Sequence, residues 1–151
     1  MKVNNYVLSA DGLRVFIGTE ARDIEPLRKY REERPAVDIA LLPIDGSALM
    51  GHGLVMNASR AVEASRVLGA RILIPIHYAL RPILVLLQTT DSITKLMHLA
   101  AGAPDLDIIP LETGRRWTWP HVLMGDGSPP LRPAGQFADR LEKGPELLEA
   151  K

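Results

Sequence analysis

The sequence predicts an α/β protein built on a mixed sheet, and three observations support this. Segments with strand character alternate with amphipathic segments along residues 1–119, and such alternation is typical of layered α/β folds. The apolar runs at 39–42 and 72–76 do not alternate with polar residues, which is typical of strands covered on both faces. The chain has 151 residues, 46% hydrophobic and 24% charged, as expected for one globular domain with its own core.

The first elements are a hairpin and a helix. Strand-like runs at 6–8 and 13–17 flank Asp11-Gly12, a favoured hairpin turn. Apolar residues then recur every third position among charged ones, which predicts a helix over about 22–33 that ends before Pro35.

The middle of the chain predicts a strand, a loop, a helix and a second strand. The run 39–43 follows Asp38 directly, and residues 44–56 have little periodicity, so we expect a long loop there. Asn57 is a candidate N-cap for a helix that ends at Gly69. The strand at 71–77 contains Pro75, which argues against pairing on both edges throughout. The strand–helix–strand order predicts a parallel crossover.

The sequence signals for the last helix and strands are weaker. Thr90 or Asp91 is a candidate cap for a helix ending at Gly102, and 106–111 and 116–119 are expected strands. Nine of the 32 residues in 120–151 are Gly or Pro, so we expect a mobile tail, with a short helix near 136–143 as an option.

Two strand ends carry the candidate chemistry, because α/β proteins place reactive groups in the loops after strands. The hairpin strand ends at Gly18-Thr19-Glu20, and the later strand ends at His77-Tyr78. A histidine there can bind a metal as neutral imidazole or transfer a proton, since its reference pKa is about 6.5. A hydrogen-bonded structural histidine is the alternative reading.

The order of these segments resembles the metallo-β-lactamase superfamily. The segments are Gly18-Thr19-Glu20, Asp38-Ile39-Ala40-Leu41-Leu42-Pro43-Ile44, a helix with Ala61, and Ile74-Pro75-Ile76-His77-Tyr78. They are most similar to the branch of ascorbate-phosphate lactonase-like proteins. The resemblance implies the C-terminal half of an αββα sandwich: a mixed sheet with helices on one face, over residues 1–119.

The same resemblance implies a metal-dependent hydrolase that uses Zn, Mn or Fe. His77 matches a metal-ligand histidine, and Thr19 stands where the family has a metal-bridging Asp, with Glu20 as the neighbouring candidate. His52, in a glycine loop, and Tyr78 are the expected substrate contacts. The family's His-x-His-x-Asp-His segment is missing from this sequence, so we expect a truncated or degenerate hydrolase that is inactive alone.

If the chain is half of an αββα sandwich, a partner is also expected. A sheet with helices on one side leaves an apolar face, which a second copy or a completing chain is expected to cover. The alternative function is therefore a non-catalytic interaction module. Net charge is zero and no cysteine occurs, which excludes thiolate zinc sites and gives no case for nucleic acid. No apolar run is long enough to span a membrane, and we expect a cytoplasmic protein.

Overall fold

The computed structural model describes residues 4–78, 87–114 and 116–118. The chain divides into two compact units, Met1–Arg116 and Trp117–Lys151, and nearly all described residues belong to the first. The predicted mobile tail at 120–151 lies outside the described residues.

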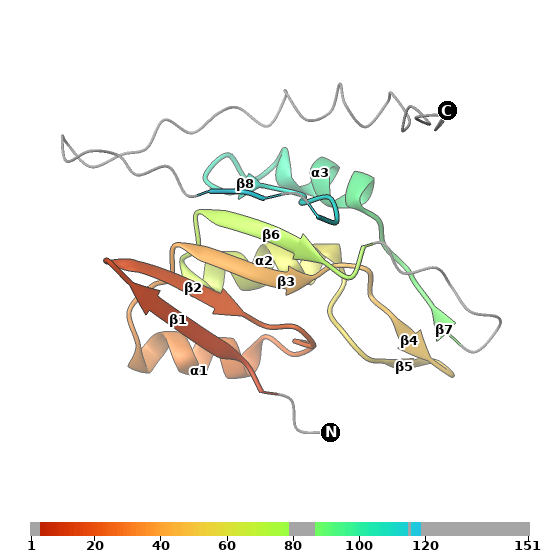
Figure 1. The fold of residues 1–151 in the computed structure, drawn as a ribbon. Coiled ribbons are helices and arrows are strands. Elements are labelled where there is room, and N and C mark those ends of the chain that lie inside the picture. The colour runs from red at the N-terminus through yellow and green to blue at the C-terminus, as the bar shows by residue number, and fades with distance from the viewer. Residues whose placement is uncertain (1–3, 79–86, 115, 119–151) are drawn as a thin grey trace, which may run out of the picture. The chain divides into compact units, whose positions relative to one another are not determined.

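The first unit is a mixed α/β fold around a five-stranded sheet with the order β1-β2-β3-β6-β8 (Figure 1). β1 pairs antiparallel with β2, and β2, β3, β6 and β8 run parallel to one another. A smaller sheet has the order β5-β4-β7. The strands are β1 Tyr6–Ala10, β2 Leu13–Ile17, β3 Ile39–Pro43, β4 Ala48–Leu49, β5 His52–Gly53, β6 Ile72–Ile76, β7 Leu87–Gln88 and β8 Asp107–Ile108, and the helices are α1 Glu25–Glu33, α2 Ala58–Leu68 and α3 Ile93–Ala100.

The predicted hairpin, crossover and main helices are confirmed. Asp11 and Gly12 both have positive φ, 49° and 79°, as a two-residue turn of this type requires. Asn57 caps α2 by accepting a hydrogen bond from the Arg60 N–H at 3.0 Å, and Gly69 ends α2 with φ 72°. Pro75 pairs with Leu42 of β3 but lies beyond the last residue of β6 that pairs with β8, so β6 is paired on one edge only at this proline, as predicted.

Several predicted boundaries are wrong. The first helix begins at Glu25 rather than near 22, because Pro26 lacks the N–H that a helix starting there would need and is tolerated only in a first turn. Residues 44–56 are not a plain loop: they contain the β4–β5 hairpin, closed by Met50 and Gly51 with positive φ. Ser92, not Thr90 or Asp91, is the N-cap of α3.

The late strands are also shorter than predicted. Only Asp107–Ile108 of the run 106–111 pairs with β6, and residues 116–118 form no strand. Residue 119 lies outside the described part. No helix of the described residues is both long and apolar enough to cross a membrane.

The helices cover one face of the large sheet. Core side chains from α1, α2 and α3 pack on the sheet residues Phe16, Ala40, Leu42, Leu73 and Ile108. Figure 1 shows α2 behind β3 and β6. None of the described helices contributes to the opposite face, which we call the second face. Strand pairing and the alternation of side chains assign to it Tyr6, Leu8, Ala10, Leu13, Val15, Ile17, Ile39, Leu41, Pro43, Ile72, Ile74, Ile76 and Asp107.

The second face is exposed only in part. Tyr6 and Leu8, at its β1 side, are 57% and 59% exposed. Ile39, Ile72 and Ile74, at its centre, are buried. The expectation of a wholly open apolar flank is therefore too simple, and whether a partner covers this face stays a prediction.

Candidate functional site

The parallel strands bring the two predicted reactive turns to the same edge of the sheet. β2, β3 and β6 run in one direction, so the residues after Ile17, Pro43 and Ile76 all emerge at their carboxyl ends. Gly18 N–H donates to the Leu41 carbonyl at 3.0 Å, and Ile44 N–H donates to the Ile76 carbonyl at 3.2 Å. This edge is the usual place for a binding site in an open α/β sheet.

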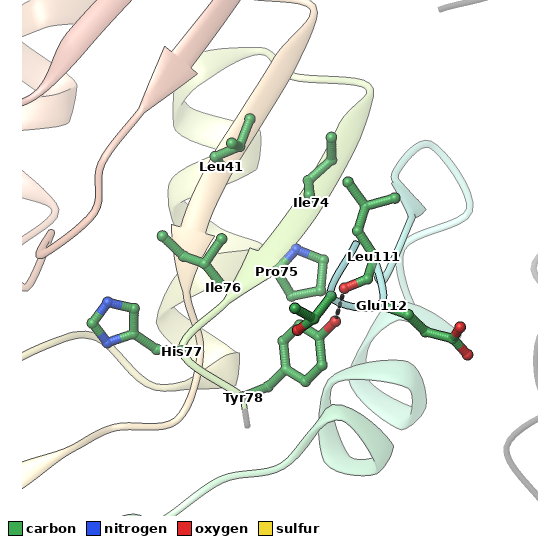
Figure 2. Close-up of a pocket in the computed structure, with 9 residues that line it drawn as sticks. Leu41, Ile74, Pro75, Ile76, His77, Tyr78, Leu111 and Glu112 are labelled. Carbon is green, nitrogen blue, oxygen red and sulfur yellow. Dashed lines mark hydrogen bonds between the residues drawn. The ribbon is translucent and has the colours of Figure 1, made fainter. Parts of the chain in front are cut away.

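His77 ends β6 in an unusual backbone conformation. Its φ is 65°, in the left-handed region, where residues other than glycine are uncommon. Its side chain is half-buried, and its ring points away from Tyr78 and Glu112 (Figure 2). Such strained positions occur often at functional sites, so this backbone conformation supports His77 as a candidate functional residue. It does not determine the role of His77.

Tyr78 points to the opposite side from His77. Its hydroxyl donates a hydrogen bond to the Leu111 carbonyl, which ties the end of β6 to the segment after β8 (Figure 2). Burial, and then the negative charge of Glu112, raise the pKa of the Tyr78 phenol. Tyr78 therefore stays protonated at neutral pH, which suits its role as a donor to Leu111.

An open pocket of about 730 Å³ lies beside these residues. The second-face residues Leu41, Ile74 and Ile76 contribute apolar side chains to it. Its remaining lining comes from the strand-end segments, namely Pro75, His77, Tyr78, Leu111, Glu112 and Thr113. The predicted pair His77 and Tyr78 thus lines one pocket (Figure 2).

The other predicted residues lie outside this lining. Thr19 and Glu20 are exposed in the turn after β2, where Ala21 N–H donates to the Gly18 carbonyl at 3.2 Å. His52 is exposed in β5, a strand of the smaller sheet. Their predicted roles as metal or substrate contacts stay predictions.

Asp45 is a carboxylate at this edge that the sequence analysis missed. It is 2% exposed, and it accepts hydrogen bonds from the Ser47 hydroxyl at 2.5 Å and the Ser47 N–H at 3.1 Å. Its carbonyl oxygen accepts from the N–H groups of Thr90 and Asp91. An Asp two residues before a Ser, directly after an apolar strand, is the available signal, since Asp side chains close such turns.

The donors at the edge do not fit a complete metal centre. A catalytic zinc site has about three protein ligands and one open position. Within the described part of the chain, no three His, Asp or Glu side chains are grouped so that they could hold a metal ion. Both carboxylate oxygens of Asp45 are already engaged by Ser47, so Asp45 holds the loop together. His77 is left as a single imidazole at the edge.

No protein-family model matches the chain, and no curated protein matches it. Among solved structures, the chain is similar to a protein from Thermotoga maritima described as a Zn-dependent hydrolase of the metallo-β-lactamase superfamily. The two are 21% identical with a TM-score of 0.44, and the match covers 62% of this chain and 43% of that one. The matched region is therefore less than half the length of that protein. Fold and site define a mixed α/β protein with helices on one sheet face and an imidazole at the carboxyl edge.

Proposed function

We propose that this chain is one half of a metal-dependent hydrolase of the metallo-β-lactamase type, supplying one metal-ligand imidazole, His77. The single observation that carries the proposal is that the turns after β2 and β6 lie at the same carboxyl edge of the sheet, on either side of β3. The ordered motifs that resemble the superfamily support it. The remaining ligands and the second sheet come from outside the described residues.

The side chains at this sheet edge suit a chain that supplies only part of a metal site. Imidazole is a good ligand for Zn, Mn or Fe, whereas the Thr19 hydroxyl is a poor substitute for a bridging carboxylate. One imidazole gives weak metal binding alone. The chain by itself is therefore not a competent hydrolase, and its substrate class stays open.

Titration with zinc chloride, followed by NMR of the histidine side chains, tests this proposal. We expect the His77 signals to respond at lower zinc concentration than those of His98, which is exposed in the last turn of α3. The His77→Ala variant should lose the tighter response, and the matched control His98→Ala should retain it. Equal responses from both histidines in the wild type would contradict the proposal.

The second candidate function is a non-catalytic interaction module. The observation that favours it is the second face, which carries apolar side chains and no described helix. Thr19 at the expected bridging position also favours a lost metal site. The zinc titration separates the two functions, because an interaction module has no reason to prefer metal at His77.

A further inference from the structure

The two outer edges of the large sheet differ in how well they are protected from pairing with another strand. At one edge, β8 is two residues long, carries Asp107 and is followed two residues later by Pro110. Short strands, charges and prolines are the usual features that keep an edge from pairing with another chain. At the other edge, β1 is five residues long and contains no charged residue and no proline (Figure 1). Among the described residues, β1 is therefore the edge that can accept a further strand.

The unused backbone groups of this edge belong to Val7 and Ser9. In the β1–β2 ladder these residues pair with Phe16 and Arg14. The backbone of Arg14 is turned toward the β3 side, because its N–H donates to the Asp38 carboxylate at 2.8 Å and its carbonyl accepts from the Asp38 N–H at 2.9 Å. Facing residues that do not bond to each other in an antiparallel ladder point their backbone groups outward. The N–H and C=O groups of Val7 and Ser9 therefore point away from β2, and no hydrogen bond between described residues engages them.

The exposed side chains of β1 on the second face are apolar. Tyr6 is 57% exposed and Leu8 is 59% exposed, in contrast to the buried residues Ile39, Ile72 and Ile74 at the centre of the same face. The accessible surface is therefore the β1 edge with its two side chains, and the centre of the sheet takes no part in it.

We propose that β1 pairs antiparallel with β1 of a second copy of this chain, which joins the two large sheets edge to edge. A two-fold axis at Val7 lets the open backbone groups bond to each other, with Val7 opposite Val7 and Ser9 opposite Asn5. The same register places Tyr6 opposite Leu8 of the second copy, so an aromatic–aliphatic pair forms twice. A strand without charge does not repel its own copy, so this edge is self-complementary.

The dimer is expected to be weak. Stable specific interfaces bury about 1,200–2,000 Å² in total, and the pairing of one five-residue strand is smaller than that. We therefore expect a dissociation constant on the order of 0.1–1 mM, with exchange between monomer and dimer. The inference does not depend on the proposed hydrolase function, since no residue of β1 lines the pocket at the carboxyl edge.

Amide hydrogen exchange of the full chain, measured by NMR in dilute solution and at about 1 mM, tests the geometry of this pairing. We expect the Val7 and Ser9 amides to be unprotected in dilute solution and to gain at least about twofold protection at the high concentration. The Leu8 amide, which faces Val15 in the ladder, is the internal control and should be protected at both. Protection of Val7 and Ser9 that does not change with concentration would overturn the inference, because the chain then covers this edge itself.

The Ser9→Pro variant tests the same edge by analytical ultracentrifugation. It removes an N–H that faces outward and leaves the β1–β2 ladder intact, as proline on an edge strand can. We expect it to weaken dimerisation at least about tenfold, because each copy loses one hydrogen bond between the chains. The matched control Ser9→Ala should associate as the wild type does. A wild type that stays monomeric up to about 1 mM, or a dimer that Ser9→Pro leaves unchanged, would also overturn the inference.

A mixing experiment tests the register. Tyr6→Glu and Leu8→Lys should each associate more weakly than the wild type, since each loses apolar pairs across the two-fold axis. An equal mixture should associate at least about threefold more tightly than either variant alone, because the introduced carboxylate then faces the introduced ammonium of the other chain. No gain on mixing would rule out the pairing centred on Val7.

Discussion

Asp91 joins three elements near the candidate site, and its removal gives the clearest test of this structure. Its side chain is 1% exposed, and it accepts a hydrogen bond from the Ala58 N–H at the start of α2 at 3.0 Å. Its other oxygen accepts from Lys95 Nζ at 2.6 Å, and its own N–H donates to the Asp45 carbonyl at 3.0 Å. Asp91 thus caps a helix to which it does not belong.

We expect Asp91→Ala to lower the free energy of unfolding by about 2–3 kcal/mol. A hydrogen bond to a charged group contributes about 1.5–3 kcal/mol, and its loss leaves the Ala58 N–H of a fully buried residue unsatisfied. The ion pair with Lys95, whose side chain is 54% exposed, adds only about 0.3–0.5 kcal/mol. Asp91→Asn keeps an acceptor oxygen and should cost about 1 kcal/mol, mainly from lost charge at the helix N-terminus.

Urea denaturation followed by circular dichroism measures these differences. The matched control is Asp105→Ala, because Asp105 is 71% exposed and lies 3.8 Å from Arg66 in a surface ion pair. This control should cost less than about 0.5 kcal/mol. An Asp91→Ala loss no larger than that of the control would refute the capping role of Asp91.

Three further predictions concern backbone conformation and charge. His77→Gly should be more stable to urea than His77→Ala by about 1 kcal/mol, because φ is 65° there; equal stabilities would contradict the strain. Gly69→Ala should destabilise by more than about 1 kcal/mol in thermal melts, since its φ is 72° and a Cβ would lie 2.8 Å from Ala36 Cβ. Gly53→Ala, with nothing within 4 Å, is the open-space control. Burial raises the pKa of Asp107, so its ionisation lowers the free energy of unfolding as pH rises. The free energy of unfolding of Asp107→Asn relative to the wild type should therefore increase from about pH 4 upwards and then level off. A difference that is constant with pH would contradict this.

The sequence predicted the strongly patterned elements well. The Asp11-Gly12 turn, the Asn57 cap and the Gly69 end follow from local chemistry that acts within a few residues. The β4–β5 hairpin was missed because its strands have two residues each and its turn starts with Met50, which gives no turn signal. Residues 116–118 of the strand predicted at 116–119 form no strand, because the Arg-Trp-Thr-Trp pattern has β propensity but does not specify a pairing partner.

The candidate site was predicted in part. His77 and Tyr78 were identified by their place at the end of an apolar strand, and both line one pocket. Asp45 and Asp91 were not identified as a linked pair, since their contacts join residues about 45 positions apart through backbone groups. Asp91 was instead expected to cap its own helix, a local role that Ser92 takes.

Residue patterns within single segments therefore determined the class of fold, the helix ends and a histidine at a strand end, because these depend on local propensity and periodicity. Only the tertiary structure decided which turns share an edge, which sheet face the helices cover, and that Asp107 lies on the other face. These features depend on strand pairing between distant segments, where a shift of one residue would move Asp107 to the opposite face of the sheet.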